Sequence, residues 1–528
     1  MTTRRESCGH PYVAVVDAAG AAQRDRAAIS AGIPSRALMQ RAGAAAAAEI
    51  VHRFPDLLSS GVLVAAGPGN NGGDGWVVAH ALHAVGIAVR VAECAAARSP
   101  DAVAERAVAV GAGVPVETGA AAVGTGAERL IVDALLGTGL TSGEPPRGEI
   151  AAGVALANAR RAKGATVVAL DLPTGVDATT GAVAGALPAA LTLTFGTMKR
   201  GLLVARESCG EIVLLDIGLG AHARVPYAQM LATAPWFRGE VPAIPASAHK
   251  GTRRKVAIIG GARGMVGAVV LAARAALRSG AGLVKCVVAP ESLAAVQEAE
   301  PAALAAVWPT DVASMDATIA SWADAVLIGP GLGGAGTRAL VSSLLSRFAG
   351  PVVLDADALN AFAGEADVLH ALFGTRAALL TPHPLEFARL TGRDVAAVLA
   401  DRFDAPAVLA RASGATVLLK GVPTVVTSPA GETIVVAEGT PTLATGGAGD
   451  LLGGIAVTLL AQTGDALRAG ALAAFAHGRA AFAVSARQVR GYMLDDVLAM
   501  LPAVWPTEPP LPRPPILAEL AAVGEVAG

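Results

Sequence analysis

Short runs of aliphatic and β-branched residues alternate along the chain with longer, alanine-rich segments of helical spacing. In the first part, strand-like runs cover residues 61–67, 87–93, 129–137, 166–173, 191–196 and 211–218, and helical segments such as "DGWVVAHALHAVG" lie between them. This alternation is typical of βαβ units, and it predicts a mostly parallel sheet with helices on both faces.

The alternation breaks near residue 221, at a stretch with four prolines and little periodicity. It resumes with strand-like runs at residues 255–261, 282–290, 325–331, 351–357, 377–383, 416–421, 424–428 and 433–439. We therefore predict one α/β domain over residues 1–222, a linker and entry to a second domain over 223–248, and a second α/β domain over 249–503. The proline-rich tail, residues 504–528, is expected to be extended or disordered.

Unusual residues follow the predicted strands in both parts. The first part has "GPGNNGGDG", "LLGTGL" and "DLPTGVD", and the second has "GGARGMVGA", "GPGLGG", "DADALN", "TPHPLE" and "KGVPT". In open α/β sheets, ligands bind outside the carboxyl ends of the strands. Because both parts carry several such loops, we expect two separate ligand sites.

In the second part, "ATGGAGDLLGG" is typical of a loop that holds a phosphate and then opens a helix. Its glycines let backbone N–H groups approach an anion, and the helix adds its positive N-terminal end. Asp450 lies where the loop enters the helix, and there it can accept the proton of a hydroxyl that attacks a phosphoryl group. Taken alone, Asp450 is more simply explained as a helix cap, because glycine-rich loops are common.

In the first part, "GPGNNGGDG" lacks the spacing of a dinucleotide fingerprint. Its asparagines offer amide oxygens, and Asp133, Asp171 and Thr174 follow neighbouring strands. Such oxygens suit a hard cation, and the N–H groups of the loop suit a pyrophosphate. Capping of a loop explains either Asp133 or Asp171 equally well when each is taken singly.

Taken in order, the second-part motifs resemble the ribokinase-like, ADP/ATP-dependent dehydratase of hydrated NAD(P)H, over roughly residues 235–501. The resemblance implies a ribokinase-like α/β fold, Mg²⁺ with ADP or ATP as phosphoryl donor, and Asp450 as catalytic base in contact with substrate. It implies nucleotide contacts from Lys420, Gly421, Val422, Pro423, Thr424 and Gly449, and substrate contacts from Ala268, Gly331 and His383. Glu386 is a candidate for holding hydrated Mg²⁺, although an exposed glutamate at a helix start is the simpler interpretation. His477 is expected in the core.

The first part, with "RDRAAISAGIPSRALMQRAG", "GPGNNGGDG", "VDALLGTGL", "DLPTGVDATTG" and "FGTMKRGLL", resembles the NAD(P)H-hydrate epimerase domain over about residues 12–219. The resemblance implies a Rossmann-like three-layer sandwich, K⁺ bound by Asn71, Asp133 and Thr174, and Asp171 as catalytic acid or base. Relatives usually carry serine in place of Thr174. Implied substrate contacts are Asn70, Asn71, Gly72, Gly73, Asp74, Gly137, Thr138, Gly139, Leu140, Thr141, Ser142, Gly143 and Asp171. Lys199 is a candidate phosphate contact, or a solvated lysine.

Together the two resemblances imply repair of hydrated NADH and NADPH. The R and S hydrates would be epimerised, and the S hydrate would be dehydrated through a phosphorylated intermediate with release of NAD(P)H, phosphate and, from ADP, AMP. Two alternatives stay open. The second part could be a vitamin kinase of the same superfamily, and the first part could be a binding or scaffold module.

Composition excludes some other classes. The chain has 53% hydrophobic residues but only 3% aromatic ones, and its apolar runs are too short or too interrupted by arginine to span a bilayer. The net charge is −2 without a basic run, which disfavours a nucleic-acid partner. Four scattered cysteines form no zinc or disulfide pattern, and no apolar core follows the charged N-terminus, so we expect a cytoplasmic protein. We also expect a homo-oligomer. The choice between ADP and ATP, and between NADH and NADPH hydrates, stays open.

Overall fold

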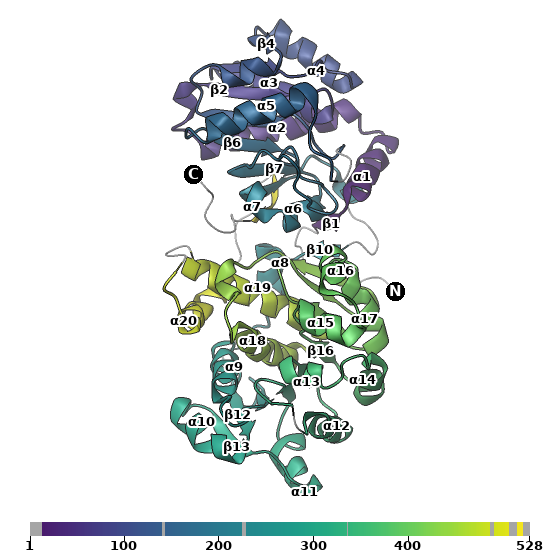
Figure 1. Ribbon diagram of the computed structural model, residues 1–528, viewed down its shortest axis with the longest axis vertical. Coiled ribbons are helices and arrows are strands. Elements are labelled where there is room, and N and C mark those ends of the chain that lie inside the picture. Colours follow the sequence, from purple (N-terminus) through teal and green to yellow (C-terminus); the bar gives the residue numbers. More distant parts are fainter. Residues whose placement is uncertain are drawn as a thin grey trace. The chain divides into compact units, whose positions relative to one another are not determined.

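A computed structural model of the protein describes residues 13–139, 143–223, 229–245, 247–334, 336–485, 490–505 and 515–520 (Figure 1). The described chain divides into two compact units. The N-terminal unit comprises residues 13–223 together with 515–520, and the C-terminal unit comprises residues 229–505. Two α/β units with helices on both faces of each sheet confirm the predicted fold class.

The N-terminal unit is built on an eight-stranded sheet. Its strands, in spatial order, are β20 (Ile516–Leu520), β9 (Glu211–Leu215), β7 (Leu191–Phe195), β6 (Thr166–Leu170), β5 (Leu130–Ala134), β2 (Val62–Ala66), β3 (Val89–Glu93) and β4 (Val116–Thr118). All neighbours pair in parallel except β20, which is antiparallel to β9. A separate parallel pair joins β1 (Ala14–Val16) to β8 (Met198–Lys199).

Both faces of this sheet are buried, and β2 shows why. Val62 and Val64 pack in one apolar cluster with α2 (Ser35–Arg53) and α3 (Asn70–Ala84). Leu63 points the other way and packs in a second cluster with α5 (Gly148–Arg161). A strand buried on both faces needs a continuous run of apolar residues, and β2 has the sequence VLVAA. The remaining helices are α1 (Ala18–Ser30), α4 (Pro100–Gly111), α6 (Arg200–Val204) and α7 (Arg206–Cys209).

The C-terminal unit has one sheet with strands in the order β13 (Leu304–Val307), β12 (Leu283–Val288), β11 (Lys255–Ile259), β14 (Ala325–Ile328), β15 (Val352–Leu354), β16 (Ala378–Leu380), β17 (Thr416–Leu419), β18 (Thr424–Thr427), β19 (Thr433–Val436) and β10 (Gln229–Leu231). Pairing is parallel from β13 to β17, and β18 is antiparallel to both of its neighbours. β10 lies parallel to β19 at the edge.

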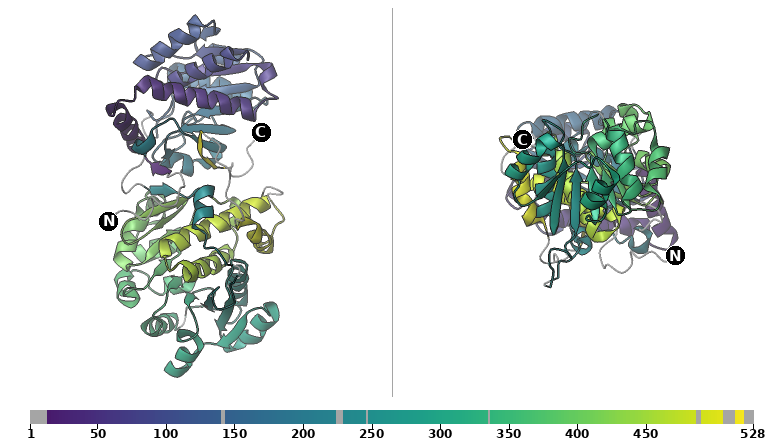
Figure 2. Two further views of the ribbon diagram at one scale, coloured as in Figure 1. Left: turned by 180° about the vertical axis from the view of Figure 1, so that it is seen from behind. Right: turned by 90° about the horizontal axis from the view of Figure 1, so that it is seen from below.

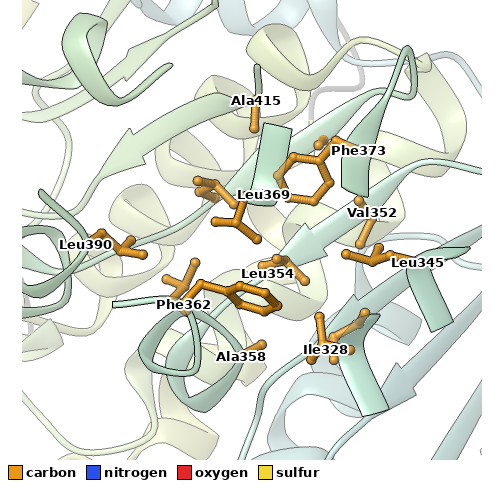
Figure 3. Close-up of a cluster of buried hydrophobic side chains, with 14 of the residues drawn as sticks. Ile328, Leu345, Val352, Leu354, Ala358, Phe362, Leu369, Phe373, Leu390 and Ala415 are labelled. Carbon is orange, nitrogen blue, oxygen red and sulfur yellow. The ribbon is translucent and has the colours of Figure 1, made fainter. Parts of the chain in front are cut away.

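Helices cover both faces of the C-terminal sheet (Figures 1 and 2). One face carries the largest apolar cluster shown in Figure 3, where Phe362, Leu369 and Phe373 pack on Leu354 of β15. The helices of this face are α12 (Thr337–Arg347), α13 (Ala356–Asn360), α14 (Ala366–Phe373), α15 (Pro384–Thr391), α16 (Val395–Ala400) and α17 (Ala405–Ser413). The other helices are α8 (Ala234–Glu240), α9 (Val266–Arg278), α10 (Leu293–Ala299), α11 (Val312–Met315), α18 (Ala448–Thr463), α19 (Ala466–Ser485) and α20 (Leu494–Val504).

The small residues of the sequence allow close helix packing. On α18, a Cβ added to Gly454 would lie 2.1 Å from the carbonyl oxygen of Ala272 on α9. Only glycine permits this approach, which explains how an alanine- and glycine-rich chain with few aromatic residues still fills its core. None of the helices in the described ranges combines the length and apolarity that a bilayer crossing needs.

Each strand that the sequence pattern predicts is present. Four short strands, β1, β4, β8 and β13, lie where the pattern predicts none, and two longer segments also differ from the prediction. Within the predicted linker, β10 and α8 are regular elements of the C-terminal unit, because Met230 and Leu231 pair with β19. Within the predicted tail, β20 adds a strand to the N-terminal sheet, where Ala518 and Leu520 are buried. The proline-rich residues 506–514 lie outside the described residues.

Candidate functional sites

The glycine loop of the C-terminal unit leads into α18, as the sequence predicts. Gly447 is the residue before the helix and has a left-handed backbone with φ 94°. A side chain here would also lie 2.8 Å from Leu271 and from Leu494, so this turn requires glycine. Gly446 has open space around its Cα. The loop is therefore a tight turn with an accessible edge at the positive end of a helix.

Asp450 is half-buried in the first turn of α18. Burial, together with the nearby carboxylates of Asp355 and Asp357, raises the pKa of its carboxyl to about 7, although Lys420 opposes the shift. A carboxyl that titrates near neutral pH can take up and release a proton during turnover. Its side chain makes no helix-capping hydrogen bond, and Gly447 occupies the capping position. The alternative interpretation of Asp450 as a helix cap is therefore wrong.

A buried ion pair lies beside Asp450. Lys420 Nζ is 2.6 Å from Asp355 Oδ1, and the Asp355 side chain is 2% exposed. Burial disfavours the charge of Lys420, but the carboxylates of Asp355 and Glu386 raise its pKa above the ordinary value. A Cβ on Gly449 would lie 3.2 Å from Lys420 Nζ, so the glycine loop and this lysine are in contact distance. The structure thus places Lys420, which follows β17, next to Gly449 and Asp450 in the first turn of α18.

His383 forms the N-cap of α15. Its Nδ1 accepts from the backbone N–H groups of Leu385 and Glu386 at 3.1 and 3.3 Å, and Glu386 accepts from the backbone N–H of His383 at 2.8 Å. Burial and the charge of Lys420 lower the pKa of His383. Glu386 is only 5% exposed, so its interpretation as an exposed helix-start glutamate is wrong. The predicted contact of His383 with substrate stays a prediction.

Two other predicted substrate contacts, Ala268 and Gly331, are neighbours. Gly331 has φ 55°, and a Cβ there would lie 3.3 Å from Cβ of Ala268 and 2.7 Å from Cβ of Met265. His477 is 6% exposed on α19, which agrees with its expected core position. Burial lowers the pKa of His477 to about 4.

The N-terminal unit contains a cavity of about 270 Å³. Its walls come from α1 and α2 on one side and from the loops after the strands on the other, and six of the predicted substrate contacts line it. These are Asn70, Asn71, Asp74, Gly137, Thr138 and Asp171. The predicted loops therefore converge on one concave site, as strand-end loops do in α/β folds.

Asp171 is held in this cavity by a lysine. Lys199 Nζ lies 2.5 Å from Asp171 Oδ1 and also donates to the hydroxyl of Thr194 and the carbonyl of Phe195. Lys199 is 3% exposed, so its interpretation as a solvated lysine is wrong. Asp171 itself has a left-handed backbone with φ 62°, which is uncommon for a residue with a side chain. Such strain concentrates at functional sites.

Asn71, Asp133 and Thr174 are linked through the backbone of Leu136, directly after β5, and of the three only Asn71 lines the cavity. The carboxylate of Asp133 accepts from the backbone N–H and the hydroxyl of Thr174, both at 2.8 Å. Burial raises the pKa of Asp133 to about 6 despite these hydrogen bonds. Asn71 donates to the carbonyl of Leu136, and its own Oδ1 is buried with no donor in the described residues. An unsatisfied amide oxygen beside a buried carboxylate and a hydroxyl is a donor set that a hard cation can use.

Other predicted residues of this site have different positions. A Cβ on Gly72 would lie 2.0 Å from the carbonyl oxygen of Gly67, and one on Gly73 would lie 2.5 Å from Met39. These two glycines therefore permit close packing of the loop and do not line the cavity. Gly139 and Gly143 do not line it either. Leu140, Thr141 and Ser142 lie outside the described residues.

Sequence reasoning missed three charged groups of the two sites. Asp25 of α1 lines the N-terminal cavity, where desolvation and Asp171 raise its pKa while Lys199 opposes the shift. Asp355 was noticed only as part of "DADALN", although its carboxylate neutralises Lys420. For Lys199 the sequence suggests a phosphate contact or a solvated lysine, and does not suggest its ion pair with Asp171. The useful signal for Asp355 was its place directly after a buried strand, because strand ends converge on the site.

Comparisons with known proteins agree with this geometry. A family model described as NAD(P)H-hydrate dehydratase matches residues 256–503, and one described as the N-terminus of YjeF-related proteins matches residues 35–201. A relative from Salinibacter ruber, named bifunctional NAD(P)H-hydrate repair enzyme Nnr, is 40% identical over 512 residues, covering 90% of this chain and 92% of the relative. A relative of the same name from Escherichia coli is 36% identical, covering 89% of each chain.

Among solved structures, an ADP/ATP-dependent NAD(P)H-hydrate dehydratase from Bacillus subtilis, co-crystallised with ATP and Mg²⁺, is 28% identical. It covers 52% of this chain and 96% of its own, with a TM-score of 0.46. The two family models and the relatives that match nine-tenths of the chain confirm the resemblances on which the sequence analysis rests. The chain belongs to the family of bifunctional NAD(P)H-hydrate repair enzymes.

Proposed function

We propose that each unit performs one reaction on the same damaged cofactor. The N-terminal cavity equilibrates the R and S forms of hydrated NADH or NADPH, and the C-terminal site dehydrates the S form with a nucleotide. One observation supports both assignments. Each site has an accessible aspartate, Asp171 or Asp450, next to a buried lysine at the carboxyl ends of parallel strands. This arrangement places a proton-transfer group beside a cation that attracts phosphate.

In the dehydratase, the C6 hydroxyl of the hydrate attacks the terminal phosphorus of the nucleotide. Asp450 accepts the hydroxyl proton, since its carboxyl titrates near neutral pH. The C6–O bond then breaks, phosphate leaves with the electron pair, and loss of a proton from C5 restores the ring double bond. Hydroxide is a poor leaving group and phosphate a good one, so nucleotide energy drives the dehydration.

The nucleotide lies, in this proposal, between the glycine loop and the segment Lys420–Thr424. Backbone N–H groups at the start of α18 and the ammonium of Lys420 attract its phosphates. The carboxylates of Asp355 and Glu386, which face Lys420, are oxygen donors of the kind that Mg²⁺ prefers. The dehydratase relative that was crystallised with ATP and Mg²⁺ supports this choice of donor and metal.

In the epimerase, Asp171 would donate a proton to the C6 hydroxyl, so that the C6–O bond breaks, water leaves and the ring nitrogen shares the positive charge. Water would then add to the other face of C6 and return its proton to Asp171, which Lys199 holds in position. Asn71, Asp133 and Thr174 would hold K⁺ through amide, carboxylate and hydroxyl oxygens. A bound K⁺ supplies fixed positive charge for the pyrophosphate of the cofactor. The threonine methyl is compatible with this set, because its hydroxyl already lies 2.8 Å from Asp133 Oδ1.

A direct assay tests both halves of the proposal. The full chain is given a mixture of R and S hydrates, first without nucleotide and then with ADP or ATP and Mg²⁺. We expect equilibration of the epimers without nucleotide, seen by chiral chromatography, and complete recovery of reduced-nicotinamide absorbance with it. Accumulation of a stable phosphate ester would instead support a vitamin kinase. Failure to equilibrate the epimers would support a scaffold role for the N-terminal unit.

We place these reactions in the cytoplasm, where both cofactors are used and thiols stay reduced. The buried cysteines Cys94, Cys209 and Cys286 are free thiols, as that compartment requires. Homo-oligomerisation remains part of the proposal, and light scattering of the purified chain tests it.

A further inference from the structure

Arg402 lies between α16 and α17, and its side chain reaches the loop that follows β17. Its Nη1 donates to the carbonyl of Val422 at 2.5 Å and to the carbonyl of Pro423 at 3.2 Å. Gly421 touches the same guanidinium, because a Cβ there would lie 2.9 Å from Nη1 and 3.0 Å from Nη2. With φ 146°, Gly421 has a backbone that other residues rarely adopt. Arg402 is thus packed directly against the segment Lys420–Thr424.

Within this segment, the N–H of Lys420 donates to the carbonyl of Pro382, and the carbonyls of the next three residues all accept hydrogen bonds. The Gly421 carbonyl accepts from the hydroxyl of Thr424 at 2.9 Å, and the carbonyls of Val422 and Pro423 accept from Arg402. The N–H groups of Gly421 and Val422, in contrast, have no acceptor in the described part of the chain. A loop whose carbonyls are occupied and whose N–H groups are not is a site for an anion.

The positive charge of Arg402 has no carboxylate partner among the described residues. Burial lowers the pKa of its guanidinium, and no ion pair in the described ranges joins it to a carboxylate. The neighbouring acids have other partners: Asp401 pairs with Arg393 at 3.0 Å, and Asp404 accepts from Gln229 at 3.3 Å. A half-buried cation with only carbonyl partners costs stability unless an anion comes close.

We infer that Arg402 is the positioning residue of the nucleotide loop. By holding the carbonyls of Val422 and Pro423, it leaves the N–H groups of Gly421 and Val422 available to the phosphates of a nucleoside diphosphate or triphosphate. Its uncompensated charge adds long-range attraction for the same anion. The inference rests on the proposed dehydratase function, because that function puts a nucleotide at this loop.

The test compares nucleotide affinity in Arg402→Ala, Arg402→Lys and a matched control, in the full chain. The control is Arg411→Ala, which removes an exposed arginine of α17. Calorimetry with ADP or ATP and Mg²⁺ gives the dissociation constant, and dehydration assays give KM and kcat. Epimerisation, measured in the same samples, shows that each variant remains folded outside this loop.

We expect Arg402→Ala to weaken nucleotide binding and raise the nucleotide KM by about 10- to 100-fold, the scale of one charged hydrogen bond. The KM for the hydrate should stay unchanged, Arg402→Lys should recover part of the affinity, and Arg411→Ala should match wild type. Wild-type affinity in Arg402→Ala would overturn the inference. So would an equal loss for nucleotide and hydrate that lysine does not rescue, since that is a purely structural effect. If the wild-type chain binds no nucleotide, the proposed dehydratase function fails first.

Discussion

The ammonium of Lys199 lies 2.5 Å from the carboxylate of Asp171, inside the N-terminal cavity and shielded from solvent. Three further carboxyls, those of Asp25, Asp74 and Asp101, line the same cavity. Burial and the nearby Asp171 raise the pKa of Asp74 well above its ordinary value, and desolvation raises that of Asp25. Lys199 also opposes the pKa shifts of Asp25 and Asp74, but in this cavity its ion pair is with Asp171.

We predict that Lys199→Met lowers epimerisation by about 10- to 100-fold, because Asp171 loses the charged partner that orients it. Lys199→Arg, which keeps a charged donor, should recover part of the rate. Rates from chiral chromatography check this, with Lys163→Met, an exposed lysine, as the control. An unchanged rate would leave Lys199 as a structural residue only.

Asp450→Asn should reduce dehydration by about 10²- to 10⁴-fold, the usual contribution of one general base. Asparagine keeps the shape of the side chain, so nucleotide binding should be retained. In the wild type, the base must be deprotonated, and burial raises the pKa of Asp450 to about 7. Dehydration at saturating substrate should therefore rise as pH increases through about 7 and fall below it.

Two controls accompany the Asp450 experiment. Asp465→Asn changes an exposed aspartate before α19 and should leave both activities unchanged. Epimerisation should persist in Asp450→Asn because that residue belongs to the other unit. A variant that still dehydrates at a near-normal rate would remove Asp450 from the mechanism.

Much of this architecture is visible in the sequence, because strands buried on both faces leave continuous apolar runs and loops follow them at the functional edge. Asp450 and Asp171 could be singled out for that reason. Lys199 and Asp355 could not be assigned, since an ion pair between distant segments depends on how strands are ordered, and local sequence does not encode that order. For Gly72 and Gly73 the structure adds a second reason for glycine, because both permit close packing next to the site, and their predicted contact with substrate stays a prediction.

Potassium should accelerate epimerisation. Asn71 Oδ1 has no donor in the described residues, and Asn71 and the Asp133–Thr174 pair are linked through the backbone of Leu136, so together they would offer K⁺ three oxygen donors. We expect the wild-type rate to fall when K⁺ is replaced by tetramethylammonium, and Asn71→Ala to be slower and less responsive to added K⁺. Dehydration in the same buffers serves as the control for nonspecific salt effects. Equal epimerisation rates with and without K⁺ would exclude the metal whatever the variants do.

The C-terminal strand β20 should stabilise the N-terminal unit. It pairs with the edge of β9 and buries Ala518 and Leu520. Its Glu519 lies 2.8 Å from Arg53, which also forms ion pairs with Glu49 and Glu211. Removing residues 511–528 exposes this apolar surface and an unpaired sheet edge, so we expect a loss of about 2 to 4 kcal/mol in the free energy of unfolding of that unit.

Heating distinguishes this effect from general damage. Brief incubation over a temperature series, followed by assays of both activities, should show epimerisation lost about 5 to 15 °C earlier in the truncated chain, while dehydration survives as in wild type. Removing only residues 521–528 keeps β20 and should change neither activity. If the chain without residues 511–528 loses both activities at a lower temperature than wild type, β20 stabilises both units. If both activities are lost at the wild-type temperature, the strand adds no measurable stability to the sheet that carries the epimerase site.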